Sequence, residues 1–392
     1  MKITSVDVFL LNCGTTAWRP IVCRVNTDEG ISGYGEASVG FDSGAPAAYA
    51  MIKDIAPLVL GMDAMAHEAV WDKLFRDTFW AQAGGTVMFS AISAIDTALW
   101  DIKGKALGVP LYKLLGGKTS DGLRSYASQL QFGWGDNMGR AVTDEELTEA
   151  CLKAVDEGFD AVKINFITFN DEGGRVGFLR GPISRKIKRM IERRVAAVRN
   201  AIGPDVDIIV ENHARTDAVS GVEMAQLLEP YGIMFMEEVA TPLNLDALKT
   251  IRQSTGIPQA GGERVFSRWA YKELFINDCI QIVQPDIGTC GGISETKKIC
   301  DMAHAFDVGV QTHVCGSPIS IAASLHMEAS IPNFVIHEHH VINRSRMNID
   351  LGIYDYVPDE HGKIHTPELP GLGQELSDWA IRNALASCTV KE

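Results

Sequence analysis

Short apolar runs alternate with longer amphipathic stretches from about residue 124 onward. Residues 208–210 are Ile-Ile-Val, a composition typical of a strand buried on both faces. Eight such runs are found, at residues 124–129, 161–166, 207–212, 233–238, 257–263, 279–286, 309–314 and 333–339. Amphipathic stretches such as 221–231 lie between them. Eight strands that alternate with helices predict an α/β fold of the (β/α)8, or TIM, barrel type.

The residues before this region follow another pattern. Runs at 6–11 and 20–37 predict strands, joined in part through the turn signal Asp28-Glu29-Gly30. Residues 45–115 are largely helical in pattern, and one of their helices ends near Gly108. Its apolar face consists of Ile92, Ile95, Ala98, Leu99 and Ile102. The pattern predicts a small α+β domain ahead of the barrel.

The end of the chain differs again, because residues after about 350 are rich in Gly and Pro. We expect this segment to return to the first domain. Three parts follow from the whole pattern: an α+β domain at 1–120, a barrel at 121–350 and a C-terminal segment at 351–392.

Composition limits the possible partners and location. The chain has 392 residues and a formal net charge of −14, which argues against nucleic acids and anionic membrane surfaces as partners. The eight cysteines are scattered without a CxxC pair, so we expect free thiols in a reducing cytoplasm. The first residues alternate like a strand, and no uncharged apolar run is long enough to span a bilayer. These features predict a cytoplasmic protein.

Three of the predicted strands end in a glutamate. Glu211, Glu237 and Glu263 are spaced by 26 residues each time, about one strand–helix unit. Because the carboxyl ends of barrel strands form one mouth, the three carboxylates should converge there. Their mutual repulsion calls for a cation, and oxygen ligands favour Mg²⁺, with Mn²⁺ possible. The alternative is that each Glu pairs separately with a Lys or Arg.

Strand alternation places other polar side chains at the same mouth. Residues two apart share a face of a strand, so His213 should lie with Glu211 while Asn212 points away. The same rule groups Lys163 with Asn165 and Gln284 with Asp286, and His313 and Glu338 end two further strands.

Between the second and third predicted strands lies a long polar segment at 168–189. Long loops in a compact domain are often functional, although a disordered excursion is the alternative. Arg215, close to Glu211 in sequence, could bind substrate or pair with one of the glutamates.

Several of these segments together resemble the enolase superfamily, mandelate racemase subgroup. The resemblance covers essentially the whole chain, and within the subgroup it is strongest to acid-sugar dehydratases of the galactonate type. It rests on residues 94–117 of the first domain and on the segments 163–165, 211–215, 262–269, 284–286 and 313–319. Glu211 stands where that type usually has Asp. Lys163-Ile164-Asn165 also lacks the second Lys that racemases of the subgroup use as a base.

The resemblance implies a (β/α)7β-type TIM barrel with an N-terminal α+β capping domain that the C-terminal tail completes. It also implies Mg²⁺ on Glu211, Glu237 and Glu263, and the loss of a proton α to a carboxylate to give an ene-diolate. His313, oriented by Asp286, would be the base, and His213 would protonate the departing 3-hydroxyl. Lys163 and, if protonated, Glu338 would stabilise the substrate carboxylate. Expected substrate contacts are Asn165, Arg215, Trp18 and Arg19.

The expected reaction is the dehydration of an aldonic or aldaric acid to a 2-keto-3-deoxy acid. The two His roles could be exchanged for a substrate of opposite configuration at C2. An epimerase, racemase or cycloisomerase on the same scaffold is the alternative activity, and a non-catalytic binding protein is a third possibility. Partners would then be a small acid sugar and other copies of the chain, as a homo-oligomer.

Overall fold

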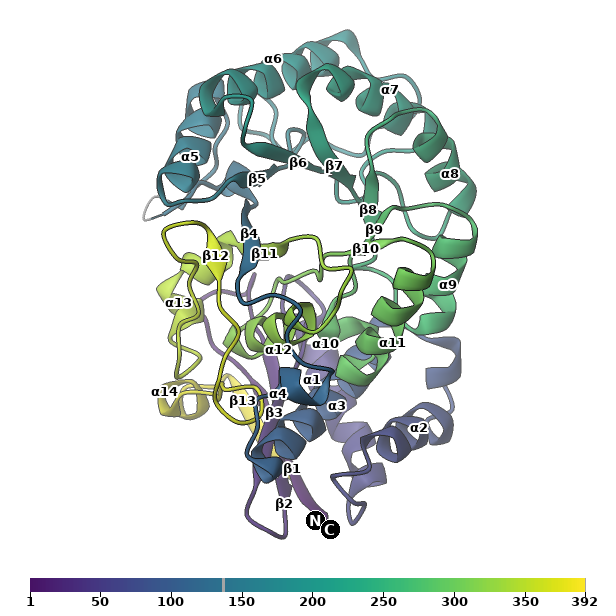
Figure 1. Cartoon of the computed structure of the whole chain (residues 1–392), viewed down its shortest axis with the longest axis vertical. Helices are drawn as coiled ribbons and strands as arrows, with labels where there is room; N and C mark the ends of the chain where they lie inside the picture. Colours follow the sequence, from purple (N-terminus) through teal and green to yellow (C-terminus); the bar gives the residue numbers. More distant parts are fainter. Residues whose placement is uncertain (136–137, 392) are drawn as a thin grey trace.

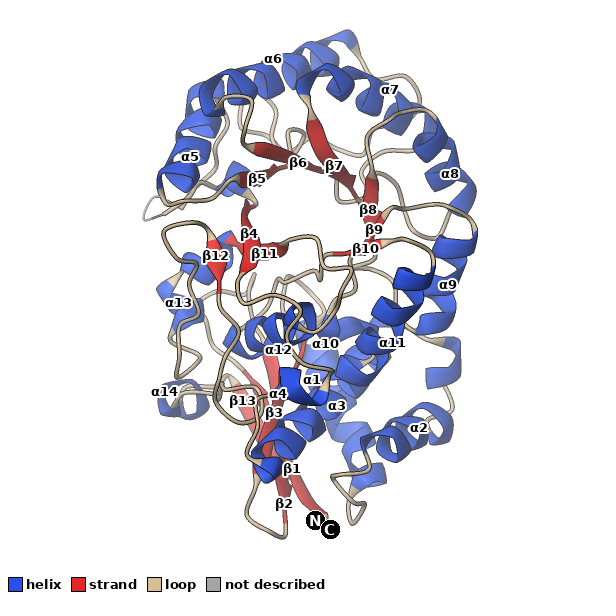
Figure 2. Cartoon of the chain, viewed as in Figure 1, coloured by secondary structure: helices blue, strands red, loops and turns tan. Residues whose placement is uncertain are grey.

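The computed structural model describes residues 1–135 and 138–391. A ring of strands surrounded by helices occupies one end of the molecule, and a second, smaller group of strands and helices lies at the other end (Figures 1 and 2). The two ends of the chain lie side by side in the smaller part (Figure 1). No helix in the described ranges is long and apolar enough to cross a membrane.

The smaller part is built on a four-stranded antiparallel sheet in the order β13-β1-β2-β3. Its strands are β1 (Ile3–Leu10), β2 (Ile21–Thr27), β3 (Ser32–Ala37) and β13 (Ala386–Lys391). The helices of this part are α1 (Ala45–Ile55), α2 (His67–Asp77) and α3 (Thr86–Leu107). Because β13 pairs with β1, the C-terminal tail completes this capping domain, as predicted.

Two glycines of β3 let helix α3 lie directly on the sheet. A Cβ atom on Gly33 would lie 2.1 Å from the carbonyl oxygen of Ala98, and one on Gly35 would lie 2.0 Å from that of Ala94. Helix α3 ends where the sequence predicts, because Gly108 adopts a left-handed φ of 68° that favours glycine. The close packing fixes the end of β3, which lies next to the barrel.

The barrel has eight parallel strands with helices between them. The strands are β4 (Leu123–Ser128), β5 (Ala161–Ile164), β6 (Asp207–Glu211), β7 (Ile233–Glu237), β8 (Gln259–Gly261), β9 (Ile282–Val283), β10 (Gly309–Val310) and β11 (His337–His340). The intervening helices are α5 (Asp144–Asp156), α6 (Arg185–Ile202), α7 (Ala218–Leu228), α8 (Leu245–Gln253), α9 (Arg268–Ile276), α10 (Ile287–Cys290) with α11 (Gly292–Ala305), and α12 (Pro318–Ala329). This connectivity is the (β/α)7β arrangement.

Hydrogen bonds around Val310 close the barrel. The N–H of Val310 donates to the carbonyl of Asn333 at 2.8 Å, and the N–H of Val335 donates back to Val310 at 2.8 Å. Residues 333–335 lead directly into β11, which in turn pairs with β4. The prediction of a TIM-type barrel is therefore confirmed.

Every predicted barrel run overlaps a strand, but all the strands except β4 are shorter than their runs. The run at 279–286, for example, contributes only β9 to the ladder. The long segment after β5 is also shorter than predicted, because Ser184 caps α6 and residues 185–189 belong to that helix. The two boundaries between the three parts of the chain remain predictions.

The capping domain docks on the barrel through a buried carboxylate of α3. Asp96 accepts hydrogen bonds from the N–H of Ser294 at 2.9 Å and from its hydroxyl at 2.6 Å, near the start of α11. Burial raises the pKa of Asp96 to about 7. Trp71 of α2 donates its indole N–H to the carbonyl of Gly291 at 2.8 Å. These contacts set the capping domain against the barrel.

Candidate active site

Three glutamates meet at the carboxyl ends of adjacent strands. Glu211 ends β6, Glu237 ends β7 in register with it, and Glu263 follows β8. One carboxylate oxygen from each lies within 4.8 Å of the other two. Burial and the repulsion of neighbouring carboxylates raise the pKa of Glu237 to about 8, and burial chiefly raises that of Glu263 to about 8. The predicted convergence is present.

Positive charge within this cluster comes chiefly from one lysine. The Nζ of Lys163 lies 2.6 Å from Glu237 and 3.5 Å from Glu211. The Oε2 atom of Glu211 is buried and accepts no hydrogen bond among the described residues. Three carboxylates with an unsatisfied buried oxygen and oxygen-only donors fit a hard divalent cation. These glutamates could hold a metal ion.

Within the described ranges, the alternative that each Glu pairs with its own Lys or Arg holds for Glu263 alone, because Glu211 and Glu237 share Lys163. Arg264 Nη1 lies 3.0 Å from the Oε1 of Glu263 and also contacts Glu238. Sequence reasoning missed this arginine, although it follows a predicted ligand directly. The direction of a side chain just beyond a strand end does not follow from strand alternation, so the sequence carried no clear signal for it.

His313 is held on one side of the cluster by Asp286. Its Nδ1 lies 2.7 Å from Asp286 Oδ2, and its Nε2 lies 3.3 Å from Glu263. Asp286 is itself fixed, because its other oxygen accepts the N–H of Gly288 at 2.8 Å at the start of α10. Burial alone would lower the pKa of His313, but Glu263 and Asp286 outweigh it and raise the pKa to about 10. The pair is oriented as predicted, with Nε2 toward the carboxylates.

His213 lies beside the other end of the cluster. Its backbone N–H donates to Glu211 Oε1 at 2.7 Å, and its Nε2 is 3.7 Å from Glu211 Oε2. The amide of Asn165 lies 3.2 Å from His213 Nδ1. When that amide donates to Nδ1, the ring proton resides on Nε2. Burial lowers the pKa of His213 to about 3, so the ring is neutral.

Glu338 and Lys163 form an ion pair at the mouth. Lys163 Nζ lies 2.8 Å from Glu338, which also accepts the Ser128 hydroxyl at 2.6 Å and the Val314 N–H at 3.0 Å. Burial would raise the pKa of Glu338, but Lys163 outweighs it and holds the pKa well below its usual range. Donation from Glu338 to substrate requires its protonated form, which the contact with Lys163 disfavours. The role of Glu338 remains a prediction.

The other expected substrate contacts have protein partners. Arg215 donates to the carbonyl of Val176 at 2.8 Å, in the long loop, and pairs with none of the three glutamates. Trp18 is buried and donates its indole N–H to Asn348 at 3.1 Å. Arg19 donates to the carbonyl of Asp42 at 2.7 Å. Substrate contact by these three residues remains a prediction.

Sequence reasoning placed Gln284 at the mouth but gave it no role. Its side-chain amide donates to Glu237 Oε2 at 2.7 Å and contacts Gln311. Glu237 is thus fixed from two sides, by Gln284 and by Lys163. The sequence signal for this placement was the two-residue spacing of Gln284 and Asp286 within the predicted strand 279–286.

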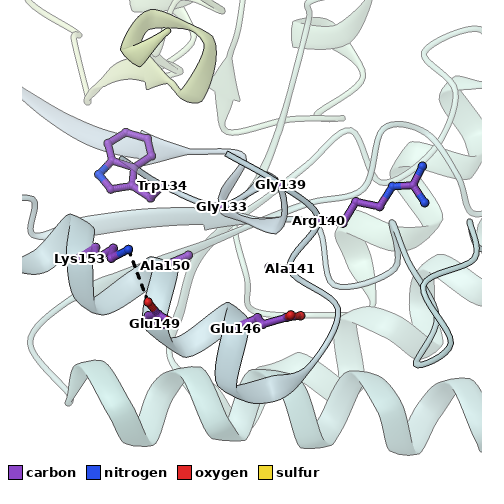
Figure 3. Close-up of a pocket in the computed structure, with 9 residues that line it drawn as sticks. All are labelled: Gly133, Trp134, Gly139, Arg140, Ala141, Glu146, Glu149, Ala150 and Lys153. Atoms are coloured by element: carbon purple, nitrogen blue, oxygen red, sulfur yellow. Dashed lines mark ion pairs between the residues drawn. The ribbon is translucent and has the colours of Figure 1, made fainter. Parts of the chain in front are cut away.

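A surface pocket of about 180 Å³ is lined by a different set of residues (Figure 3). It opens between α5 and the loop that follows η3 (Leu130–Phe132). Its charged lining residues include Lys153 and Glu149, which lie 3.4 Å apart. None of the predicted site residues lines this pocket.

Two family models match the chain. Residues 9–116 match the mandelate racemase / muconate lactonizing enzyme N-terminal domain, and residues 146–380 match the enolase C-terminal domain-like family. A D-galactonate dehydratase of Xanthomonas axonopodis pv. citri is 34% identical over 390 residues, which is 98% of this chain and 94% of that protein.

Solved structures agree with this comparison. A member of the enolase superfamily from Salmonella Typhimurium is 48% identical, with a TM-score of 0.97 and 100% of both chains covered. The 3,6-anhydro-D-galactonate cycloisomerase of Zobellia galactanivorans is 27% identical, with a TM-score of 0.83, and the match covers 98% of this chain and 100% of that one. The chain therefore belongs to the mandelate racemase / muconate lactonizing enzyme family of the enolase superfamily.

Proposed function

We propose that this dehydratase, a carbon–oxygen lyase, removes water from an aldonic or aldaric acid with the help of Mg²⁺ and forms a 2-keto-3-deoxy acid. The family and the full-length dehydratase relatives support an enzyme of this kind. The observation that carries the specific reaction is the placement of two imidazoles beside one carboxylate cluster, His213 next to Glu211 and His313 next to Glu263.

Glu211, Glu237 and Glu263 would hold the ion. When bound, Mg²⁺ supplies positive charge at the substrate carboxylate, which makes the α proton more acidic; Mn²⁺ has the same ligand preferences. Lys163 adds a fixed cation at the same place, 2.6 Å from Glu237. Its charge opposes the negative charge that develops when the C2 proton leaves.

His313 is the proposed base. In its neutral form His313 donates Nδ1–H to Asp286, and its free Nε2, which faces the cluster, takes the C2 proton. A cation held by Glu263 would offset the carboxylate charge that raises the pKa of His313 in the ion-free site, which would favour this neutral form. Asp286 stabilises the imidazolium that results. The electron pair left at C2 forms the ene-diolate and then expels the 3-hydroxyl.

His213 is the proposed acid. In its imidazolium form, with Asn165 at Nδ1, His213 would donate Nε2–H to the departing hydroxyl to give water and would be left as neutral imidazole. The enol that remains tautomerises to the keto acid, so the overall change is the loss of one water. For a substrate of opposite configuration at C2, His213 would be the base and His313 the acid.

The function is tested with purified protein, Mg²⁺ and a panel of aldonic and aldaric acids, with α-keto acid measured by carbonyl trapping. The proposal expects one or more acids to give product, and expects EDTA or His313→Asn to abolish it. The cycloisomerase similarity makes an isomerase the second candidate. Deuterium entry at C2 from D₂O without any keto product would favour the isomerase and overturn the dehydration.

A further inference from the structure

The end of strand β3 and the residue that follows it reach from the capping domain to two loops of the barrel. One loop, 313–317, carries His313, and the other, 286–288, carries Asp286. Glu36 and Ser38 lie two residues apart and contact one loop each. Both members of the proposed base pair are therefore approached by a single short segment of the other domain.

Glu36 fastens the loop that carries His313. The N–H of Ser317 lies 3.0 Å from both carboxylate oxygens of Glu36, and the Ser317 hydroxyl donates to Oε2 at 2.6 Å. Ser317 also caps α12 through Ile319. Glu36 is only 2% exposed and forms no ion pair with a lysine or arginine of the described ranges, and burial raises its pKa to about 7. A buried carboxylate without a cation is costly, so its hydrogen bonds to Ser317 must be well formed.

Ser38 contacts the loop that carries Asp286. Its N–H donates to the carbonyl of Gly288 at 3.0 Å. The approach is close, because a Cβ atom on Gly288 would lie 2.0 Å from the Ser38 hydroxyl oxygen. Gly288 is also the residue whose N–H is accepted by Asp286. The position of Asp286 therefore depends on the same backbone unit that β3 contacts.

The loop of His313 has two further attachments. Val314 donates its N–H to Glu338, and the carbonyl of Gly316 accepts the side-chain amide of Asn348 at 3.1 Å. Asn348 in turn accepts the indole N–H of Trp18 from the capping domain. The loop is thus held at Val314 by Glu338 of the barrel, and at Gly316 and Ser317 by contacts that lead to the capping domain.

We propose that Glu36 is a positioning residue for the Asp286–His313 pair, through which the capping domain sets the alignment of the base. The inference rests on the proposed function, since it assigns His313 as the base. Glu36 touches neither His313 nor Asp286; it acts through Ser317, four residues after His313. Misplacement of a catalytic group by about 1 Å can cost on the order of a hundredfold in rate.

The structure offers a matched control. Asp96, like Glu36, is a buried acid of the capping domain that accepts both the N–H and the hydroxyl of one barrel serine. Its partner Ser294 belongs to α11 rather than to either loop. Glu36→Gln and Asp96→Asn each replace one acceptor oxygen by an amide donor in the same kind of contact, so they separate positioning of the base from loss of domain docking.

The experiment compares wild type, Glu36→Gln and Asp96→Asn. We would measure the melting temperature, Mg²⁺ affinity, kcat and KM on an active acid sugar, and the low-field proton NMR signal of the His313 Nδ1–H, assigned with His313→Asn. Glu36→Gln should lower kcat by about tenfold to a hundredfold with KM within about twofold, and should shift or broaden the NMR signal. Asp96→Asn should leave kcat and the signal unchanged.

Unchanged kcat and an unchanged signal in folded Glu36→Gln would overturn the inference, as would equal losses in both variants. Should Glu36→Gln not fold, Ser317→Ala replaces it, because it removes the hydroxyl that donates to Glu36 Oε2. If wild type turns over no acid sugar, the proposed function fails while the NMR comparison still decides the positioning role. In that case a His313 Nδ1–H signal that Glu36→Gln leaves unchanged rejects the positioning role of Glu36. A shift of this signal in Glu36→Gln but not in Asp96→Asn supports that role.

Discussion

Lys163 and Glu237 lie 2.6 Å apart in the barrel mouth, and the same lysine is 2.8 Å from Glu338 and 3.5 Å from Glu211. Both members of the first pair are 1% exposed. One buried ammonium is therefore shared by three carboxylates, which explains why this lysine cannot be neutral: burial would lower its pKa, but the surrounding carboxylates raise it well above its ordinary value.

Loss of this lysine should destabilise the ion-free protein. Lys163→Met leaves uncompensated buried carboxylates, and breaking a buried pair in this way costs about 3 to 5 kcal/mol. Lys153→Met, which breaks only the exposed pair with Glu149, should cost roughly 0 to 1 kcal/mol. Urea unfolding in EDTA measures both changes. Equal effects of the two substitutions would contradict the shared-cation arrangement.

Metal binding should release protons near neutral pH. The pKa of Glu237 and Glu263 is raised to about 8, so a large fraction of both groups is protonated at pH 7, whereas a ligand carboxylate is ionised. Calorimetry of Mg²⁺ binding at pH 7 in buffers of different ionisation enthalpy should give different apparent heats. The difference should shrink at pH 9. Heats of Mg²⁺ binding that are independent of buffer at pH 7 would argue against a raised pKa for Glu237 and Glu263.

The same two groups give the ion-free protein a pH-dependent stability. A carboxyl whose pKa is higher in the folded protein than the 4.5 of an ordinary Glu binds more protons when folded, so its contribution favours folding at low pH. That contribution should be lost as the pH rises from about 4.5 to about 8. Glu237→Gln should flatten this part of the pH profile of the unfolding free energy in EDTA, and an unchanged slope would refute the assignment.

Removal of His313 and removal of His213 should block different steps of the reaction. His313→Asn removes the proposed base, so both deuterium entry at C2 and keto product should fall by roughly a hundredfold or more. His213→Asn removes the proposed acid and should keep the C2 exchange while the keto product is lost. Proton NMR of the substrate in D₂O follows the first step, and carbonyl trapping follows the second. The opposite pattern would exchange the two roles.

Arg215 should matter for the order of the long loop. Its guanidinium donates to Val176, while its own carbonyl accepts the N–H of Leu179 at 2.8 Å. Arg215→Ala should speed amide hydrogen exchange around residues 176–179 by several-fold. Arg180→Ala is the control, since that arginine contacts the ring of Phe178 within the loop itself. Similar exchange in both variants would mean that Arg215 does not hold the loop.

The fold could be predicted because its signals are local and repeated. Runs such as Ile208 to Val210 mark strands buried on both faces, and their regular recurrence with helices indicates a barrel. The strand ends could not be predicted as well. The strands β6 and β7 end at Glu211 and Glu237, although the strand-like pattern in the sequence continues beyond them. The following residues form loops held by tertiary hydrogen bonds, and His213, for example, has a φ of 49°.

The cluster of three glutamates was visible because their spacing matches the repeat of the fold. Contacts made by long or bulky side chains were not visible. Arg264 extends back to Glu263, Arg215 extends to another loop, and Trp18 enters the core and binds Asn348. Nor does the sequence show charge states: Glu338 is ionised because Lys163 lies against it, a contact between strands far apart along the chain.

The pairing of β1 with β13 has a consequence for how the molecule is made. Asp7 and Thr389 are hydrogen-bonded although they are 382 residues apart in the sequence. During synthesis the free edge of β1 waits on the order of tens of seconds for its partner strand to leave the ribosome. An open strand edge is prone to pair with other chains in that interval. The barrel can therefore be complete while the sheet that covers it still lacks a strand, and the edge of β1 is covered only when β13 is in place.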